Sequence, residues 1–262
     1  MKIGASTLSG FKGKLEKSLE FIENNGIEYA EILHQYPNET INTEITDSFN
    51  LKYTIHSPII NINIASLSTA IRKASIEEIK KSIDTANEIG AETVVVHPGS
   101  IPFLGRDFEK EIYGLANDAI KEIGDYGKDL GVTAAIENMP AIEGHMYQNI
   151  YDLNELLTSL DMFMTLDIGH AHHVGYAPDE MYFESIKHIH AHDNNGDEDA
   201  HYALGEGNID LKSIINKFEK EKYDGIYIIE VNDEDSVKKS LEYLKNMKKW
   251  ILFLFFKLIF YL

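Results

Sequence analysis

The chain has 262 residues, of which 44% are hydrophobic and 26% charged, as expected for a globular domain that buries a large core. It contains no cysteine, which excludes disulfides and thiolate metal sites and fits a reducing compartment. The start, MKIGAST, lacks the charged region and long apolar core of a signal peptide, so we expect a cytoplasmic location. The formal net charge of -19 opposes strong nonspecific binding to nucleic acid, because such binding rests on lysine and arginine contacts to phosphate.

Short apolar stretches alternate with helical patterns along the chain. We predict strands at residues 2–7, 29–33, 51–55, 93–96, 132–136, 162–166, 186–191 and 225–229. The main helices are expected at 15–25, 75–90, 107–130, 151–160, 178–184, from 210 onward and at 233–249. The second of these should begin at Ser75, because Ser75-Ile-Glu-Glu78 has the pattern of a capping box.

This alternation predicts one α/β domain, a (β/α)8 TIM barrel over residues 1–249. A doubly wound open sheet is the structural alternative. Residues 250–262 read WILFLFFKLIFYL and form an apolar C-terminal tail, shorter than the ~20 residues that span a bilayer. A membrane-surface contact, an oligomer contact and a non-native extension are the alternatives for this tail.

Side chains of the kind that bind metals stand at the ends of six consecutive predicted strands. The carboxyl ends of barrel strands meet at one mouth, where barrel active sites are assembled. We therefore predict that these imidazoles and carboxylates converge on a divalent-metal centre, with zinc as the expected ion. The predicted ligands are His56, His97, Glu137, Asp167, His170, His190, Asp199, His201 and Glu230.

This set is too large for one ion. Four carboxylates and five imidazoles at one mouth cannot stay ionised together without cations, because like charges disfavour each other's ionisation. The set suits two or three ions, with Glu137 placed to bridge. Such a cluster can bind a phosphate diester, create a hydroxide at neutral pH and stabilise the leaving alkoxide.

The remaining histidines receive weaker expectations. His192, next to Asp193, is expected to hold a supporting or substrate role, and His34 is a weaker candidate for substrate contact. His145 and His188 are expected on the surface, and His172 and His173 at the mouth or in water. The segment Gly205-Glu-Gly-Asn-Ile-Asp210 resembles a phosphate loop only superficially and is expected to form a tight turn before a helix.

The motifs VVHPGS, IENMP, DIGHA and HYALGEGNID resemble those of the xylose isomerase-like barrel superfamily, over residues 1–247. This superfamily includes endonuclease IV (AP endonuclease family 2) and many sugar isomerases and epimerases. The resemblance to endonuclease IV implies three zinc ions. It implies that the first zinc ion is held by His56 and His97, and that Glu137 bridges the first and second ions. The second ion is then completed by Asp167, His190 and Glu230, and the third is held by His170, Asp199 and His201.

Two functions follow from the resemblance. The first is a zinc-dependent phosphodiester hydrolase that cleaves DNA at abasic sites in DNA repair, with a metal-bound hydroxide as nucleophile. The second is a sugar or sugar-phosphate isomerase or epimerase with one Mn²⁺, Mg²⁺ or Co²⁺ held by the residues of the second site. In that case Glu137 and Glu230 would exchange a proton with the sugar as acid and base. A metal-binding scaffold ranks last.

The number of ligands favours the hydrolase, whereas the loops favour the isomerase. The segment His34–Thr40 lacks the arginine- and tryptophan-bearing recognition loop of endonuclease IV, and Ile59-Ile60 replaces the pair that wedges into DNA. We give the ligand count more weight and expect the hydrolase first.

Overall fold

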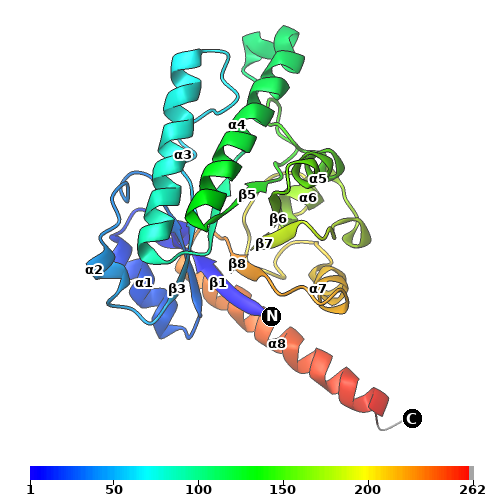
Figure 1. Ribbon diagram of the computed structural model, residues 1–262. Coiled ribbons are helices and arrows are strands. Elements are labelled where there is room, and N and C mark those ends of the chain that lie inside the picture. The colour runs from blue at the N-terminus through cyan, green and yellow to red at the C-terminus, as the bar shows by residue number, and fades with distance from the viewer. Residues whose placement is uncertain (260–262) are drawn as a thin grey trace.

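Eight parallel strands close into a barrel in the computed structural model, which describes the backbone of residues 1–259 and the side chains of residues 1–247. Each strand pairs with its sequence neighbours, and β8 pairs with β1 (Figure 1). This closure excludes the open-sheet alternative. The strands are β1 (Lys2–Ser6), β2 (Tyr29–Leu33), β3 (Lys52–His56), β4 (Thr93–Val96), β5 (Thr133–Glu137), β6 (Phe163–Asp167), β7 (Ile186–Ala191) and β8 (Ile226–Ile229).

Helices surround the barrel in the order expected for a TIM barrel. They are α1 (Leu15–Asn24), α2 (Thr43–Thr46), α3 (Thr69–Ile89), α4 (Glu109–Leu130), α5 (Ile150–Ser159), α6 (Ile168–Val174), α7 (Leu211–Lys220) and α8 (Glu234–Ile259). Three short 3-10 helices accompany them: η1 (Thr7–Gly10), η2 (Phe103–Phe108) and η3 (Pro178–Glu180). The predicted single-domain TIM barrel is confirmed.

The core lies mainly between the strands and the surrounding helices. All five residues of β2 are buried, as expected for a strand covered on both faces. Ile22, Ile83, Ile120 and Phe218 project from four helices and are fully buried against the sheet. Each such side chain contributes about 1.5–3 kcal/mol to the free energy of unfolding, so the helices are anchored by their apolar faces.

One helix starts earlier than predicted, and another was not predicted. α3 begins at Thr69 and not at Ser75, whose hydroxyl is buried within the helix and donates to the carbonyl of Ile71. The same hydroxyl accepts the N–H of Asn63, so Ser75 ties down the preceding loop instead of capping the helix. α6, which the sequence analysis did not predict, starts directly after β6.

The C-terminal helix α8 runs beyond the body of the barrel in Figure 1. Its backbone is helical through Ile259, so the first ten residues of the predicted tail continue the helix from residue 250; the side chains of that tail lie outside the described residues. Within the part of the chain that the structure describes, no helix has both the length and the apolar character needed to cross a membrane.

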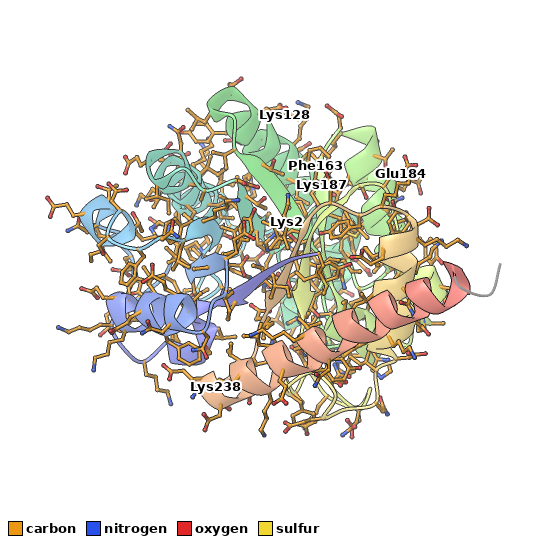
Figure 2. All side chains as sticks on the ribbon, turned by 90° about the horizontal axis from the view of Figure 1, so that it is seen from below. Lys2, Lys128, Phe163, Glu184, Lys187 and Lys238 are labelled. Carbon is orange, nitrogen blue, oxygen red and sulfur yellow. The ribbon has the colours of Figure 1, made fainter. Side chains whose placement is uncertain are left out.

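The two ends of the barrel carry different side chains. Figure 2 looks at the end where the strands begin, with Lys2, Phe163 and Lys187 from β1, β6 and β7. There the ammonium of Lys187 lies 5.7 Å from the ring centroid of Phe163. The side chains of the predicted metal centre all lie at or beyond the opposite strand ends, so this face is the back of the molecule.

Candidate metal centre

The structure brings the nine predicted ligands together around Glu137, the last residue of β5. One oxygen of Glu137, Oε2, lies 3.0 Å from Nε2 of His97 and 3.4 Å from Nε2 of His56. The other, Oε1, lies 3.0 Å from Nδ1 of His190 and 3.7 Å from Nδ1 of His170. Glu137 is therefore placed between predicted ligands from β3, from β7, from the loop after β4 and from α6.

A first group consists of Glu137, Asp167, His190 and Glu230, from the ends of β5 to β8. One ligand atom from each of the four lies within 4.8 Å of the others, and all four side chains are buried. Nδ1 of His190 is 3.2 Å from Oε2 of Glu230 and 3.9 Å from Oδ2 of Asp167. His56, His97 and Glu137 form an adjacent group under the same distance limit.

A second centre forms beyond the ends of β6 and β7 from His170, His192, Asp199 and His201. Nε2 of His170 lies 3.2 Å from Oδ2 of Asp199, and Nε2 of His201 lies 3.4 Å from Oδ1 of Asp199. His192 stacks on the ring of His201 with centroids 3.9 Å apart. His192 was expected only in a supporting or substrate role, but it lies within this group beside the three predicted ligands.

Backbone carbonyls orient three of these histidines in the same way. Nδ1 of His56, His170 and His201 lies 2.8–2.9 Å from the carbonyl oxygens of Ser57, Asn138 and Glu230, respectively. A carbonyl only accepts, so Nδ1 carries the proton and Nε2 faces the other ligands. His201 holds this orientation with a φ of 49°, in the left-handed region that is unfavourable for a side chain of its size.

The strand ends themselves are locked by a polar network. Oδ1 of Asp167 accepts the N–H of His170 at 2.7 Å and caps α6, which places His170 one turn into that helix. The amide of Asn138 binds the backbone of Asp167 on both sides, at 2.8 Å and 3.1 Å, and so ties the end of β5 to the end of β6. Gly169 packs against the ring of His192, where a Cβ would collide with it.

Histidine charges compensate the carboxylates of the centre. Burial alone would raise the pKa of Glu137, but His190 and His97 outweigh it and hold that pKa well below the usual range. Burial alone would lower the pKa of His170, but Asp167, Asp199 and Glu137 raise it to about 10. The same opposition, with Asp199 and Glu230 as the main partners, raises the pKa of His201 to about 9. In the metal-free protein, protons therefore supply the positive charge that the carboxylates require.

The donor set fits divalent metal ions. Among the described side chains, Oε2 of Glu137, Oδ2 of Asp167, Oδ1 of Asp199 and both ring nitrogens of His192 are buried without a hydrogen-bond partner. Each buried polar group left in that state costs about 1–3 kcal/mol. Carboxylate oxygens and imidazole nitrogens are the ligands that zinc, manganese and cobalt accept, so metal ions would satisfy these atoms.

The sequence analysis missed Glu31, and its surface prediction for His188 is wrong. His188 is fully buried, and its Nε2 lies 2.7 Å from Oε2 of Glu31. Oε1 of Glu31 lies 3.0 Å from Nε2 of His190, on the side of that ring away from Glu137. A single carboxylate within the apolar segment Tyr29–Leu33 is the signal that could have revealed Glu31.

Three further histidines, His34, His145 and His172, lie in different surroundings outside the ligand groups. His145 is half-buried at the mouth, so its surface prediction is also wrong. His34 is hydrogen-bonded to Ser82 at 2.8 Å and lines a separate cavity between α3 and the loop after β2. His172 lies away from the ligand groups, with Nε2 2.7 Å from Oδ1 of Asn208.

A cavity of about 180 Å³ opens above the metal centre. Its walls include seven of the nine predicted ligands, four histidines and three acids, together with apolar side chains. Among the described residues, no lysine or arginine lines it. The lining residues are Leu8, His56, Ile59, His97, Glu137, Met139, Pro140, His145, His170, Asp199, His201 and Glu230.

Comparison with known proteins identifies the fold family. Residues 19–247 match the family model described as xylose isomerase-like TIM barrel. The chain belongs to this family. An uncharacterised protein of Methanocaldococcus jannaschii is 33% identical, over 94% of this chain and 89% of that protein. A solved D-tagatose 3-epimerase-like protein is 32% identical, with a TM-score of 0.87 over 96% of this chain and 98% of its own.

More distant family members have named activities. Fructoselysine 3-epimerase of Shigella flexneri is 26% identical over 62% of this chain and 60% of that protein. A probable endonuclease 4 of Acholeplasma laidlawii is 22% identical over 73% of this chain and 72% of its own length. A solved D-psicose 3-epimerase, 18% identical over 88% of this chain and 85% of its own, has a TM-score of 0.76 and supports the fold alone.

Proposed function

We propose that the protein is a divalent-metal-dependent sugar epimerase or isomerase. The observation that carries this proposal is the meeting of Glu137 and Glu230 at one nitrogen of His190, with oxygens 3.0 Å and 3.2 Å from its Nδ1. The two glutamates extend from β5 and β8, three strands apart in a ring of eight, and so approach the centre from nearly opposite walls.

Two carboxylates on opposite walls suit proton exchange at a carbon next to a carbonyl. One glutamate would remove the proton from one face of a bound sugar, and the other would return a proton to the opposite face, which inverts that carbon. Glu137, Asp167, His190 and Glu230 would hold a Mn²⁺, Mg²⁺ or Co²⁺ ion, whose chemistry is to polarise the sugar's oxygens. The residues themselves hold and move the proton.

Three further observations support a small sugar over DNA. The solved D-tagatose 3-epimerase-like protein, at 32% identity over 96% of this chain, is more similar than the endonuclease 4 of Acholeplasma laidlawii, at 22% over 73%. The mouth cavity of about 180 Å³ suits a small molecule. Specific DNA contacts bury roughly 1,000–2,500 Å² of a positively charged surface, and this chain has a net charge of -19.

Deuterium exchange tests the proposal without knowledge of the product. The Mn²⁺-loaded protein, incubated with a panel of ketohexoses in D₂O, should introduce deuterium next to the carbonyl of at least one sugar. Glu137→Gln and Glu230→Gln should each lower that rate at least ~100-fold, as expected for loss of a general acid or base. Glu143→Gln, on an exposed residue paired with Arg106, should retain the rate. Absence of exchange with every ketose would overturn the proposal.

A zinc-dependent phosphodiester hydrolase is the second candidate, because the structure assembles ligand groups that a one-metal isomerase does not need. His56 and His97 converge on Glu137, and Asp199 and His201 form the second centre. Metal analysis of the purified protein separates the two functions. Two or three zinc ions per chain, with one lost in Asp199→Asn, and cleavage of an abasic DNA duplex would favour the hydrolase. One ion that is retained in Asp199→Asn favours the epimerase or isomerase.

A further inference from the structure

A second cavity of about 190 Å³ adjoins the mouth cavity, and the proposed proton transfer does not use it. Ile59, His97, Met139 and His145 line both cavities, so the two meet across these four side chains. A molecule bound at the metal centre therefore lies next to this second cavity, which we call the annex.

The wall of the annex is mostly apolar, and its polar members are His97, Ser100 and His145. Ile64 and Ile79 are each 1% exposed and form part of its wall, and Ile62 contributes a half-buried side chain to its lining. Among the described residues that line it, none is an aspartate, glutamate, lysine or arginine. The annex would therefore bind an apolar group and would leave a charged group without a partner.

The backbone N–H groups of the loop after β7 decide whether this loop could bind a phosphate. In many TIM barrels the loops after the seventh and eighth strands supply the phosphate site, and backbone N–H groups are common donors to such anions. Here the carboxylate of Asp193 accepts the N–H groups of Asn194, Gly205 and Ile209 at 2.9–3.2 Å. Asp193 is fully buried, and Gly207 packs against its carboxylate with no room for a Cβ.

The protein's own carboxylate thus occupies the backbone donors that a phosphate would need. Arg72 and Arg106, the chain's two arginines, are engaged elsewhere: Arg72 with the carbonyl of Ser66 and Arg106 with Glu143. Both cavities at the mouth lack lysine and arginine among their described lining residues. A phosphorylated sugar would meet no lysine or arginine in either cavity.

We infer that the substrate is an unphosphorylated sugar that carries an apolar substituent, with the sugar at the metal centre and the substituent in the annex. This inference rests on the proposed function and narrows its substrate class. Of the two substrate classes expected from the sequence, sugar and sugar phosphate, it selects the unphosphorylated sugar.

Binding of matched ketoses to the full-length Mn²⁺-loaded protein tests the inference. For each ketohexose of the panel, the unmodified sugar, its 1-O-butyl and 6-O-butyl ethers and its 6-phosphate are compared by calorimetry. One of the two ethers should bind at least ~10-fold more tightly than the parent sugar, because its methylenes leave water. The 6-phosphate should bind more weakly than the parent.

A charge placed in the annex should remove this preference. Ile62→Glu should abolish the gain from the butyl group, measured as the ratio of the affinities for the ether and for the parent sugar. Ile71→Glu is the matched control, since Ile71 is 51% exposed on α3 and lines neither cavity, and it should retain the gain.

Equal binding of the ethers and the parents, or tighter binding of the phosphate, would overturn the inference. Preference for an ether without deuterium exchange into any sugar would contradict the proposed function but support the annex. If no ketose of the panel binds, in modified or unmodified form, both are wrong.

Discussion

Glu31 is positioned to control the orientation of His190. It faces Nε2 of His190 at 3.0 Å while its other oxygen is hydrogen-bonded to His188 and to Thr54. If Nδ1 of His190 ligates a metal, the proton of that ring resides on Nε2, and Glu31 is the acceptor within reach. Its carboxylate would then fix the tautomer and increase the basicity of Nδ1.

We predict that Glu31→Gln weakens the affinity for Co²⁺ or Mn²⁺ by ~10-fold or more, the usual cost of losing such a partner. Metal-competition titration measures the affinity, and the visible spectrum of the Co²⁺ protein should shift because the ring is reoriented. Glu28→Gln is the control, on an exposed residue just before the same strand that pairs with Lys52. Unchanged affinity and spectrum would show that Glu31 is only a structural residue.

The raised pKa values of His170 and His201 predict how the metal-free protein responds to alkali. Both values, about 10 and about 9, lie above the ordinary 6.5. The stabilisation from these charged pairs is therefore complete below pH 6.5 and is lost as the pH rises through 9 and 10. Asp199 acts in the opposite direction: its pKa lies below the ordinary 3.8, so its contribution is lost only in strong acid.

The free energy of unfolding of the metal-free protein should accordingly fall by roughly a few kcal/mol between pH 7 and pH 10, because the raised pKa values couple folding to proton binding. Urea denaturation in the presence of a chelator measures this change. His201→Gln should flatten the dependence, and metal affinity should rise over the same range because a bound imidazole must lose its proton. A stability that rises with pH would contradict the assignment.

At the scale of elements, the loop between β7 and α7 is organised by one buried carboxylate. We predict that Asp193→Ala lowers the free energy of unfolding by about 3 kcal/mol or more, because three backbone N–H groups lose their acceptor. Denaturant unfolding measures the change. Asp197→Ala, in the exposed part of the same loop, should be close to neutral. A small effect of Asp193→Ala would indicate that water replaces the carboxylate.

The elements also show where sequence patterns reach their limit. The strand positions could be predicted from short apolar stretches, because barrel strands covered on both faces are buried along most of their length. The start of α3 did not, because a serine followed by a glutamate has the same pattern inside a helix as at its start, and only the contact between Ser75 and Asn63 separates the two. The helix α6 is a single short element, too brief for its periodicity to stand out.

At the scale of the molecule, the eightfold alternation and the strand-end residues were enough to predict both the barrel and the convergence of the nine ligands. What could not be predicted depends on contacts between distant segments. Glu31 and His188 are separated by 157 positions in the chain and meet only inside the closed barrel. The annex likewise forms where the loops after β3, β4 and β5 meet, and no local pattern indicates its volume.

The geometry of the metal centre depends on the pairing of β8 with β1, which closes the barrel. β1 supplies none of the candidate ligands, yet it flanks the strand that precedes Glu230. A chain in which this last seam has not formed would contain all the ligand residues but would lack the geometry to hold an ion with four of them. Only molecules with a closed barrel should therefore retain the metal ion. Incompletely folded molecules should lose their ion to a weak chelator.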